Sequence, residues 1–268
     1  MHFKRWISGL TGAVILITIL VRGGQYGFIM FVTLASVIAF HEYQRIVRSK
    51  NRIKTGKLIF AIGHITGIFI LLSAHAAPDH IPIIFAANLI ICGSIAVFQS
   101  KVDPNVLEVF MYEILGILYI PFFLSYAVLI RNLPHGITLV FWILVVVFTG
   151  DVAALYAGTY FGKHKLWPTV SPKKTMEGSM GGICANLFFG LAFPSIFLSS
   201  ISPFKCVIFS LFVGCIGQVG DLFESLLKRS ADVKDSGTIM PGHGGILDRI
   251  DAVLFALPFT YYYFLFIL

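Results

Sequence analysis

Long apolar segments recur along the whole sequence and limit what the chain can fold into. We distinguish about nine of them, at roughly 6–21, 24–40, 57–76, 81–98, 108–130, 137–161, 178–198, 204–227 and 248–268. A helix needs about 20 apolar residues to cross a hydrocarbon layer about 30 Å thick. We therefore expect an all-α integral membrane protein, a polytopic bundle of about nine transmembrane helices.

The composition excludes an ordinary soluble domain. Hydrophobic residues make up 57% of the chain, the mean hydropathy is +0.87, and 26 Phe stand against 13 acidic residues. The four cysteines lie inside apolar segments without ligand-like spacing, so we interpret them as packing residues rather than disulfide or zinc ligands: Cys92, Cys184, Cys206 and Cys215.

The basic residues predict an orientation in the membrane. With the N-terminus in the cytoplasm, 17 of the 20 Lys and Arg residues fall on the cytoplasmic side, and only Arg22, Arg131 and Lys205 fall outside. The positive-inside rule thus explains the net charge of +7 without nucleic acid, and it predicts an external C-terminus. We interpret the basic segment 41–57 mainly as a topology signal that touches anionic lipid, with a direct substrate role as the alternative.

Acidic residues concentrate in the C-terminal part of the chain. Eight of the 13 lie between 151 and 251, namely Asp151, Glu177, Asp221, Glu224, Asp232, Asp235, Asp248 and Asp251. Charges inside spans are costly in lipid and usually line a polar site. We therefore divide the chain into an N-terminal hydrophobic multispan half, 1–135, and a C-terminal catalytic multispan half, 136–268.

Helical spacing places several polar residues on common faces. Asp221, Ser225 and Lys228 are spaced i, i+4 and i+7, and Asp248 and Asp251 are spaced i and i+3. Facing carboxylates without sulfur or paired histidine suit Mg²⁺, which substrate phosphates often complete. The alternative is that the acids only form helix-end ion pairs with neighbouring Lys and Arg.

Two polar segments carry the features of phosphate sites. The stretch DSGTIMPGHGG, 235–245, has glycines whose amides can point at an anion, with a tight turn as the alternative explanation. His243 within it is a proton donor, a phosphate contact, or a residue that fixes the loop by hydrogen bonding. The segment 162–178 adds lysines and hydroxyls, which fit a second wall for a polyphosphate or, again, positive-inside charge.

Residues 225–251, SLLKRSADVKDSGTIMPGHGGILDRID, resemble the signature of the phosphatidate cytidylyltransferases, or CDP-diacylglycerol synthases. Asp151, Ala154 and Gly158, followed by FGKHKLWPTVSPKKTMEG at 161–178, resemble a second block of the family. Met240, Leu155 and Met176 depart from its usual residues, and residues 1–130 resemble it only in being hydrophobic. The matching positions are Ser225, Lys228, Arg229, Lys234, Asp235, Gly237, Pro241, His243, Gly244, Gly245, Asp248, Arg249 and Asp251.

The resemblance implies the reaction of CTP with phosphatidate to give CDP-diacylglycerol and pyrophosphate, a nucleotidyl transfer in phospholipid biosynthesis. It also implies an all-helical fold and a homodimer. Further implications are dependence on Mg²⁺, with a second cation left open, and a multi-pass location in a bacterial inner or plasma membrane with the active site at the cytoplasmic side.

Roles for individual residues follow from the resemblance together with the spacing. Asp221 and Asp248 are expected to hold Mg²⁺, with Asp251 as a further ligand or support. The expected catalytic residues are these three aspartates with Lys228 and Arg229. The expected substrate-binding residues are Ser171, Lys173, Lys174, Thr175, Ser225, Lys234, His243, Gly244, Gly245 and Arg249.

Other functions are compatible with some of these features. A transporter or channel also places acids inside spans, but it would spread them across the membrane depth. A cytidylyltransferase for an ether-linked lipid differs only in the tails, which the sequence does not distinguish. The Asp-x-x-Asp-Gly pattern of the CDP-alcohol phosphotransferases is absent.

Overall fold

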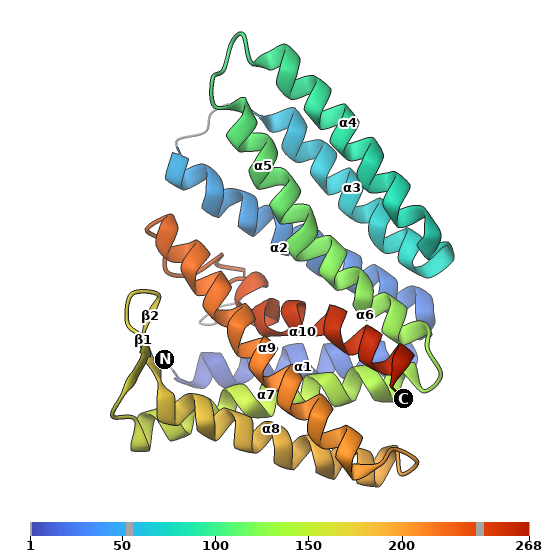
Figure 1. Cartoon of the computed structure of the whole chain (residues 1–268), viewed down its shortest axis with the longest axis vertical. Coiled ribbons are helices and arrows are strands. Elements are labelled where there is room, and N and C mark those ends of the chain that lie inside the picture. The colour runs from blue at the N-terminus through green and yellow to red at the C-terminus, as the bar shows by residue number, and fades with distance from the viewer. Residues whose placement is uncertain (1, 52–55, 240–243, 268) are drawn as a thin grey trace. The chain divides into compact units, whose positions relative to one another are not determined.

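A computed structural model describes residues 2–51, 56–239 and 244–267, and these are almost entirely helical (Figure 1). The helices are α1 His2–Arg22, α2 Gly24–Asn51, α3 Lys57–Ala76, α4 Ile81–Gln99, α5 Val106–Ile117, α6 Phe123–Asn132, α7 Gly136–Phe161, α8 Met176–Phe197, α9 Pro203–Ser230 and α10 Leu247–Phe266. A short 3-10 turn, Pro78–His80, precedes α4, and a π-helical turn, Leu118–Phe122, joins α5 to α6.

Seven helices in the described part of the chain are long and apolar enough to cross a membrane. They are Gly24–Ser49, Lys57–Ala76, Pro78–Gln99, Val106–Asn132, Gly136–Phe161, Met176–Phe197 and Pro203–Ser230. The expected all-α membrane protein is thus confirmed in its main features. The expectation of about nine spans and the orientation of the termini stay predictions.

The chain divides into two compact units. The first contains the residues up to Asn132 together with Ser230–Arg249, and the second contains Leu133–Arg229 and Ile250–Leu268. The described residues of 230–249, a segment that the sequence assigned to the catalytic half, therefore belong to the same compact unit as the N-terminal helices. The functional division of the chain at 135/136 is a separate matter and stays a prediction.

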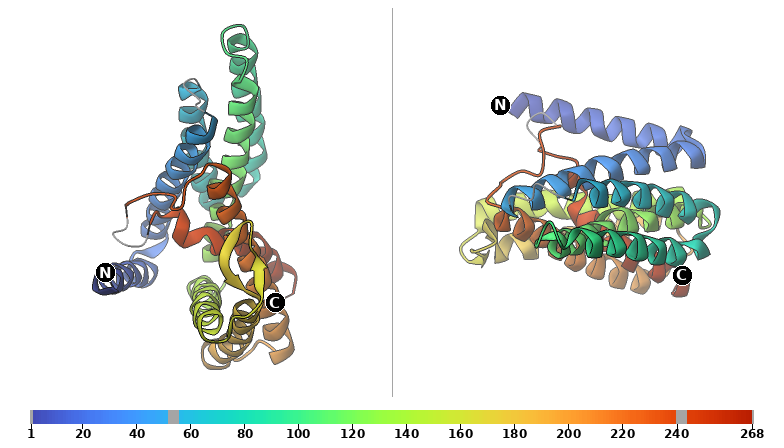
Figure 2. Two further views of the ribbon diagram at one scale, coloured as in Figure 1. Left: turned by 90° about the vertical axis from the view of Figure 1, so that its left-hand side faces the viewer. Right: turned by 90° about the horizontal axis from the view of Figure 1, so that it is seen from above.

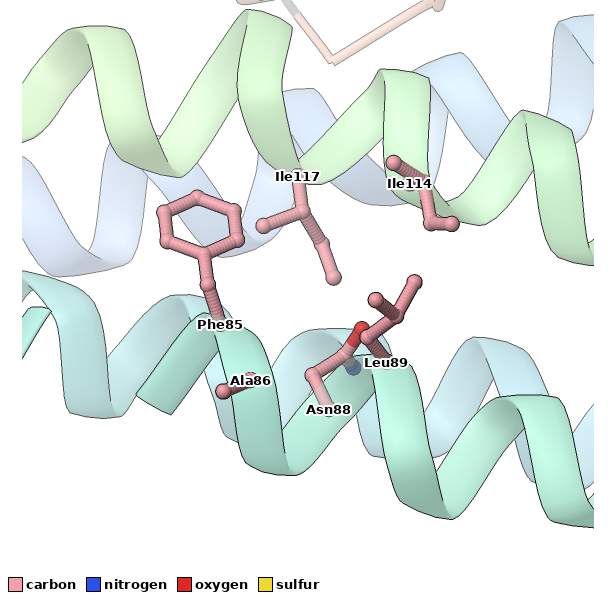
Figure 3. Close-up of a pocket in the computed structure, with 6 residues that line it drawn as sticks. All are labelled: Phe85, Ala86, Asn88, Leu89, Ile114 and Ile117. Atoms are coloured by element: carbon pink, nitrogen blue, oxygen red, sulfur yellow. The ribbon is translucent and has the colours of Figure 1, made fainter. Parts of the chain in front are cut away.

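In the first unit, α3 and α4 form a helical hairpin, and α2, α5 and α6 pack against α3 (Figures 1 and 2). Buried polar groups link three of these helices. Asn88 Nδ2 on α4 donates to Thr66 Oγ1 at 3.0 Å and to Glu113 Oε1 at 2.9 Å. The same asparagine lines a largely apolar cavity of about 160 Å³ between α4 and α5, which contains none of the predicted site residues (Figure 3).

In the second unit, α7 and α8 lie side by side along their whole length (Figures 1 and 2). Small residues allow this approach, because a Cβ at Gly178 would stand 2.8 Å from the carbonyl oxygen of Ala154 and 3.1 Å from Cα of Gly158. Small residues are the usual means by which membrane helices pack closely. The aromatic core of this unit is Trp142, which packs on Phe209 and donates to the carbonyl of Gly190 at 3.0 Å.

Two segments that the sequence suggested to be loops have regular structure. Helix α2 continues to Asn51, so much of the basic segment 41–57 is helical. Between α7 and α8 the chain forms an antiparallel hairpin of β1, Lys165–Trp167, and β2, Ser171–Thr175, with Lys165 opposite Thr175. Among the described residues, this hairpin is the one two-stranded sheet beside the helices.

Candidate active site

The hairpin is fixed to the start of α8 by two side chains. Thr175 is the N-cap of α8, and its Oγ1 accepts a hydrogen bond from the amide of Gly178 at 3.1 Å. The carboxylate of Glu177 accepts the amides of Lys163 at 3.1 Å and His164 at 3.2 Å, and it also contacts the ring of His164. The lysines of β2 thus stand on an anchored element rather than on a loose loop.

The hairpin meets α9 through predicted site residues from both elements. Lys174 forms an ion pair with Asp221, and both side chains are half-buried. At the end of α9, Arg229 Nε donates to the carbonyl of Val170 at the turn of the hairpin, at 3.4 Å. The structure therefore brings together two groups of residues that the sequence assigned separately to substrate phosphates and to a cation.

Further charged groups of the second unit gather near Asp221. Asp251 on α10 is 9% exposed and interacts electrostatically with Asp221, Asp151 and Lys228. Lys228 also forms an ion pair with Glu224, which has no exposed surface. Ser225 Oγ reaches Asp221 Oδ1 at 3.5 Å, so the predicted common face of α9 is present but the contact is long.

In the first unit, Asp248 organises the loop that precedes α10. Its Oδ2 accepts the amide and the hydroxyl of Ser236, both at 2.9 Å, and the amide of Gly245 at 2.8 Å. Lys234 and Arg249 are exposed on this unit. The predicted pairing of Asp248 with Asp221 involves both units and stays a prediction.

Local geometry explains why glycine stands at two positions of this loop. Gly244 has φ +82°, in the left-handed region, and a Cβ there would stand 2.4 Å from Asp248 Oδ2. The amide of Gly245 donates to that same oxygen. The role of Gly244 and Gly245 as a phosphate cradle is not tested by these contacts, and His243 lies outside the described residues.

Sequence reasoning missed two acids. Glu177 was grouped with the other acids but was not recognised as the anchor of the hairpin. Glu42, in the basic segment 41–57, received no role, yet it is buried and accepts hydrogen bonds from the loop before α10. The sequence signal that could have identified Glu42 is its position as a single acid next to the apolar segment 24–40 and within the basic segment 41–57.

The donor groups fit Mg²⁺ in one of its usual modes. Among the described residues, no three His, Cys, Asp or Glu side chains form a ready ligand cluster. Mg²⁺ commonly uses one or two carboxylates and completes its shell with waters and substrate phosphates. Neighbouring carboxylates such as Asp221 and Asp251, without sulfur ligands, are compatible with that mode.

Comparisons with known proteins agree with these features. The family model described as "Cytidylyltransferase family" matches residues 3–267. The chain is 46% identical over 149 residues to the phosphatidate cytidylyltransferase of Bacillus subtilis (strain 168), a match that covers 55% of each chain.

Longer matches cover nearly the whole chain. It is 31% identical over 257 residues to the phosphatidate cytidylyltransferases of Staphylococcus aureus (strain COL) and of Staphylococcus saprophyticus, with 95% of each chain covered. The matching region thus includes the hairpin, α9 and the loop before α10. This chain belongs to the cytidylyltransferase family.

Proposed function

We propose that the chain is a phosphatidate cytidylyltransferase, which converts CTP and phosphatidate into CDP-diacylglycerol and pyrophosphate. The observation that carries this proposal is the match over 95% of the chain to relatives that bear this name. The signature at 225–251 and the seven apolar helices support it, since one substrate is soluble and the other is a membrane lipid.

The chemistry requires charge neutralisation more than proton transfer. A phosphate oxygen of phosphatidate, anionic near neutral pH, attacks the α-phosphorus of CTP and forms a new phosphorus–oxygen bond. The bond between the α-phosphorus and the bridging oxygen breaks, and pyrophosphate leaves with that electron pair. Because both substrates are polyanions, catalysis depends on positioning and on cationic groups, as in other phosphoryl-type transfers.

The hairpin and the end of α9 supply those cationic groups. Lys173 and Lys174 stand on β2, and Lys228 and Arg229 end α9. We assign them to the phosphates of CTP and of the lipid headgroup, with Lys234 and Arg249 in support. Ser171, Thr175 and Ser225 contribute hydroxyls to the same substrates. The ion pair of Lys174 with Asp221 supports this assignment, because it joins a proposed phosphate-binding lysine to a proposed metal ligand.

The acids of this site are assigned to the metal ion. Asp221 and Asp248 are the proposed ligands, and Asp251 is a further ligand or a support for them. When bound, Mg²⁺ supplies positive charge against the triphosphate and the charge that develops during transfer. The aspartates would bind and orient the Mg²⁺ ion. None of them is assigned as a general base.

The location and assembly are part of the same proposal. The active site faces the cytoplasm of a bacterial membrane, where CTP is available and where the basic residues gather under the positive-inside rule. The functional form is a homodimer. The charge distribution supports the cytoplasmic side, and the family resemblance supports the homodimer.

A labelling experiment tests the proposal directly. Purified protein in detergent is incubated with phosphatidate, Mg²⁺ and CTP labelled at either the α- or the γ-phosphorus. The α-label is expected in the organic phase and the γ-label in aqueous pyrophosphate, and removal of divalent metal should stop both transfers. Absence of α-label from the lipid would refute the proposal, and γ-label in the lipid would indicate a kinase instead.

The same assay distinguishes the nearest alternative substrate. Ether-linked phosphatidate is supplied in place of the ester-linked lipid at equal concentration. Faster transfer to the ester lipid is expected, and exclusive transfer to the ether lipid would identify a cytidylyltransferase for a different lipid phosphate.

A further inference from the structure

Glu42 is a buried acid in the C-terminal half of α2 that the proposed chemistry does not use. It is 3% exposed. Its Oε1 accepts the amide of Ile246 at 3.1 Å, and its Oε2 accepts the amide of Leu247 at 2.8 Å. Oε2 also lies 3.2 Å from the hydroxyl of Ser236. Ser236 and Ile246 lie in the loop before α10, and Leu247 is the first residue of that helix. All three are about 200 positions further along the chain than Glu42.

The carboxylate caps α10 from another helix. The first amides of a helix have no partner within it, and negative charge is favourable at that end. A buried carboxylate is costly unless such donors satisfy it. The two requirements meet here, because Glu42 supplies acceptors to the amides of Ile246 and Leu247, which in turn satisfy the buried acid.

Two glycines fit closely around this carboxylate. A Cβ at Gly237 would stand 2.3 Å from Glu42 Oε1, and a Cβ at Gly245 would stand 2.3 Å from Oε2. Both distances are too short for real atoms, so any larger residue would displace the side chain of Glu42. These glycines of the signature are therefore explained by close contact with an acid from the N-terminal part of the chain.

The same loop holds Asp248. The hydroxyl of Ser236 lies between the two acids, 3.2 Å from Glu42 Oε2 and 2.9 Å from Asp248 Oδ2. Gly245 donates its amide to Asp248, and the next two amides donate to Glu42. One short segment, Gly245–Leu247, is thus held at its first amide by Asp248 and at its next two amides by Glu42, and a shift of one acid moves the backbone that binds the other.

We propose that Glu42 is a positioning residue for Asp248: it fixes Ser236 and the segment Gly245–Leu247, and so sets the orientation of that aspartate for the metal and substrate phosphates. This inference rests on the proposed function. It gives the N-terminal half of the chain a defined part in the reaction, through an acid that does not contact the substrates.

The test compares Glu42→Gln with Glu113→Gln. Glutamine at position 42 keeps the shape but replaces one acceptor oxygen by an NH₂ group that faces amide donors. Glu113 is an equally buried acid of the same unit, but its partner is Asn88 rather than the loop. We expect Glu42→Gln to lower turnover by about 10- to 100-fold and to raise the Mg²⁺ concentration for half-maximal rate, as supports of metal ligands typically do. Glu113→Gln should behave as wild type in both measurements.

A second readout does not depend on activity or on metal. Amide hydrogen exchange is measured over residues 244–250 in metal-free protein. We expect exchange to accelerate at least about tenfold in Glu42→Gln, since the amides of Ile246 and Leu247 lose a charged acceptor. Exchange should be unchanged in Glu113→Gln. Ser236→Ala, which removes only the bridging hydroxyl, should shift both readouts in the same direction but less.

Distinct outcomes overturn the inference and the function beneath it. If wild-type protein transfers no cytidylyl group, the proposed function fails. If wild type is active and the folded fraction of Glu42→Gln keeps wild-type turnover and Mg²⁺ dependence, Glu42 has only a structural role and the inference fails. If Glu42→Gln does not fold, unchanged Mg²⁺ dependence and exchange in Ser236→Ala overturn it instead.

Discussion

Glu224 on α9 has no exposed surface, and its ion-pair partner Lys228 lies one turn further along with only 13% of its side chain exposed. Removing two charges from water is expensive, and the attraction between them offsets that cost only while both are present. The pair therefore contributes little as a unit, but breaking it leaves a buried charge.

This asymmetry gives a stability prediction. Lys228→Ala should lower the free energy of unfolding by about 3 kcal/mol or more, whereas the double variant Lys228→Met with Glu224→Gln should lose clearly less. Denaturant unfolding in detergent micelles measures both. Equal losses in the single and double variants would show that the ion pair does not carry the effect.

The sequence predicts contacts between residues one helical turn apart, but it does not predict contacts between distant segments. The i, i+4 spacing of Glu224 and Lys228 is visible in the sequence, and helix-end ion pairs were weighed as an alternative for these acids. The pairing of Lys174 with Asp221 is not visible, because the hairpin and α9 are far apart along the chain. Glu42 was missed because its partners are also far away along the chain. In addition, two of them are backbone amides, which no side-chain pattern in the sequence reveals.

Packing between elements depends strongly on small residues in α7 and α8. A Cβ at Gly178 would meet the backbone of α7 at Ala154 and Gly158, as well as Thr175 Oγ1 at 3.0 Å. Backbone atoms cannot move aside as a flexible side chain can. Gly93 on α4 differs, because its added Cβ would find its nearest neighbour at 3.7 Å.

These two glycines make a matched pair of variants. Gly178→Ala should destabilise the protein by about 1–3 kcal/mol, the usual cost of overpacking. Gly93→Ala should be neutral or stabilising by up to about 1 kcal/mol, since alanine is the better helix former. Melting temperatures in the same detergent measure the difference. A Gly178→Ala variant as stable as Gly93→Ala would contradict the close packing of α7 on α8.

The sequence predicts helices better than it predicts where they end. Apolar length found the helical segments, because the membrane requires it. It failed at α2, which continues through a basic stretch to Asn51, because charged and polar helical residues leave no hydropathy signal. The hairpin β1–β2 was also missed, since a short pair anchored by Thr175 and Glu177 has no clear alternating pattern.

At the scale of the whole molecule, the distribution of charge makes the strongest prediction. Seventeen of the 20 basic residues fall on one side if the N-terminus is cytoplasmic. That prediction puts the β1–β2 hairpin and the loop before α10 in the cytoplasm, where CTP is present, and the turn between α8 and α9 outside.

Labelling from each side of the membrane checks this orientation. In a cysteine-free background, Thr169→Cys in the hairpin and Ser200→Cys after α8 each introduce one exposed thiol. A membrane-impermeant maleimide should label Thr169→Cys only in inverted vesicles and Ser200→Cys only in right-side-out vesicles. Reversed labelling would contradict the orientation, and labelling of both from one side would contradict the span between them.

The most direct test of the account is the turnover of Asp221→Asn across a Mg²⁺ titration in folded, purified protein. The matched control is Asp232→Asn, at an exposed residue with φ 54° where asparagine is well tolerated. We expect Asp221→Asn to lose at least about 100-fold in the rate of α-label transfer from CTP to phosphatidate, while the control stays near wild type. Near-full turnover of Asp221→Asn with unchanged Mg²⁺ dependence would contradict the claim that this carboxylate binds the metal at the site of transfer.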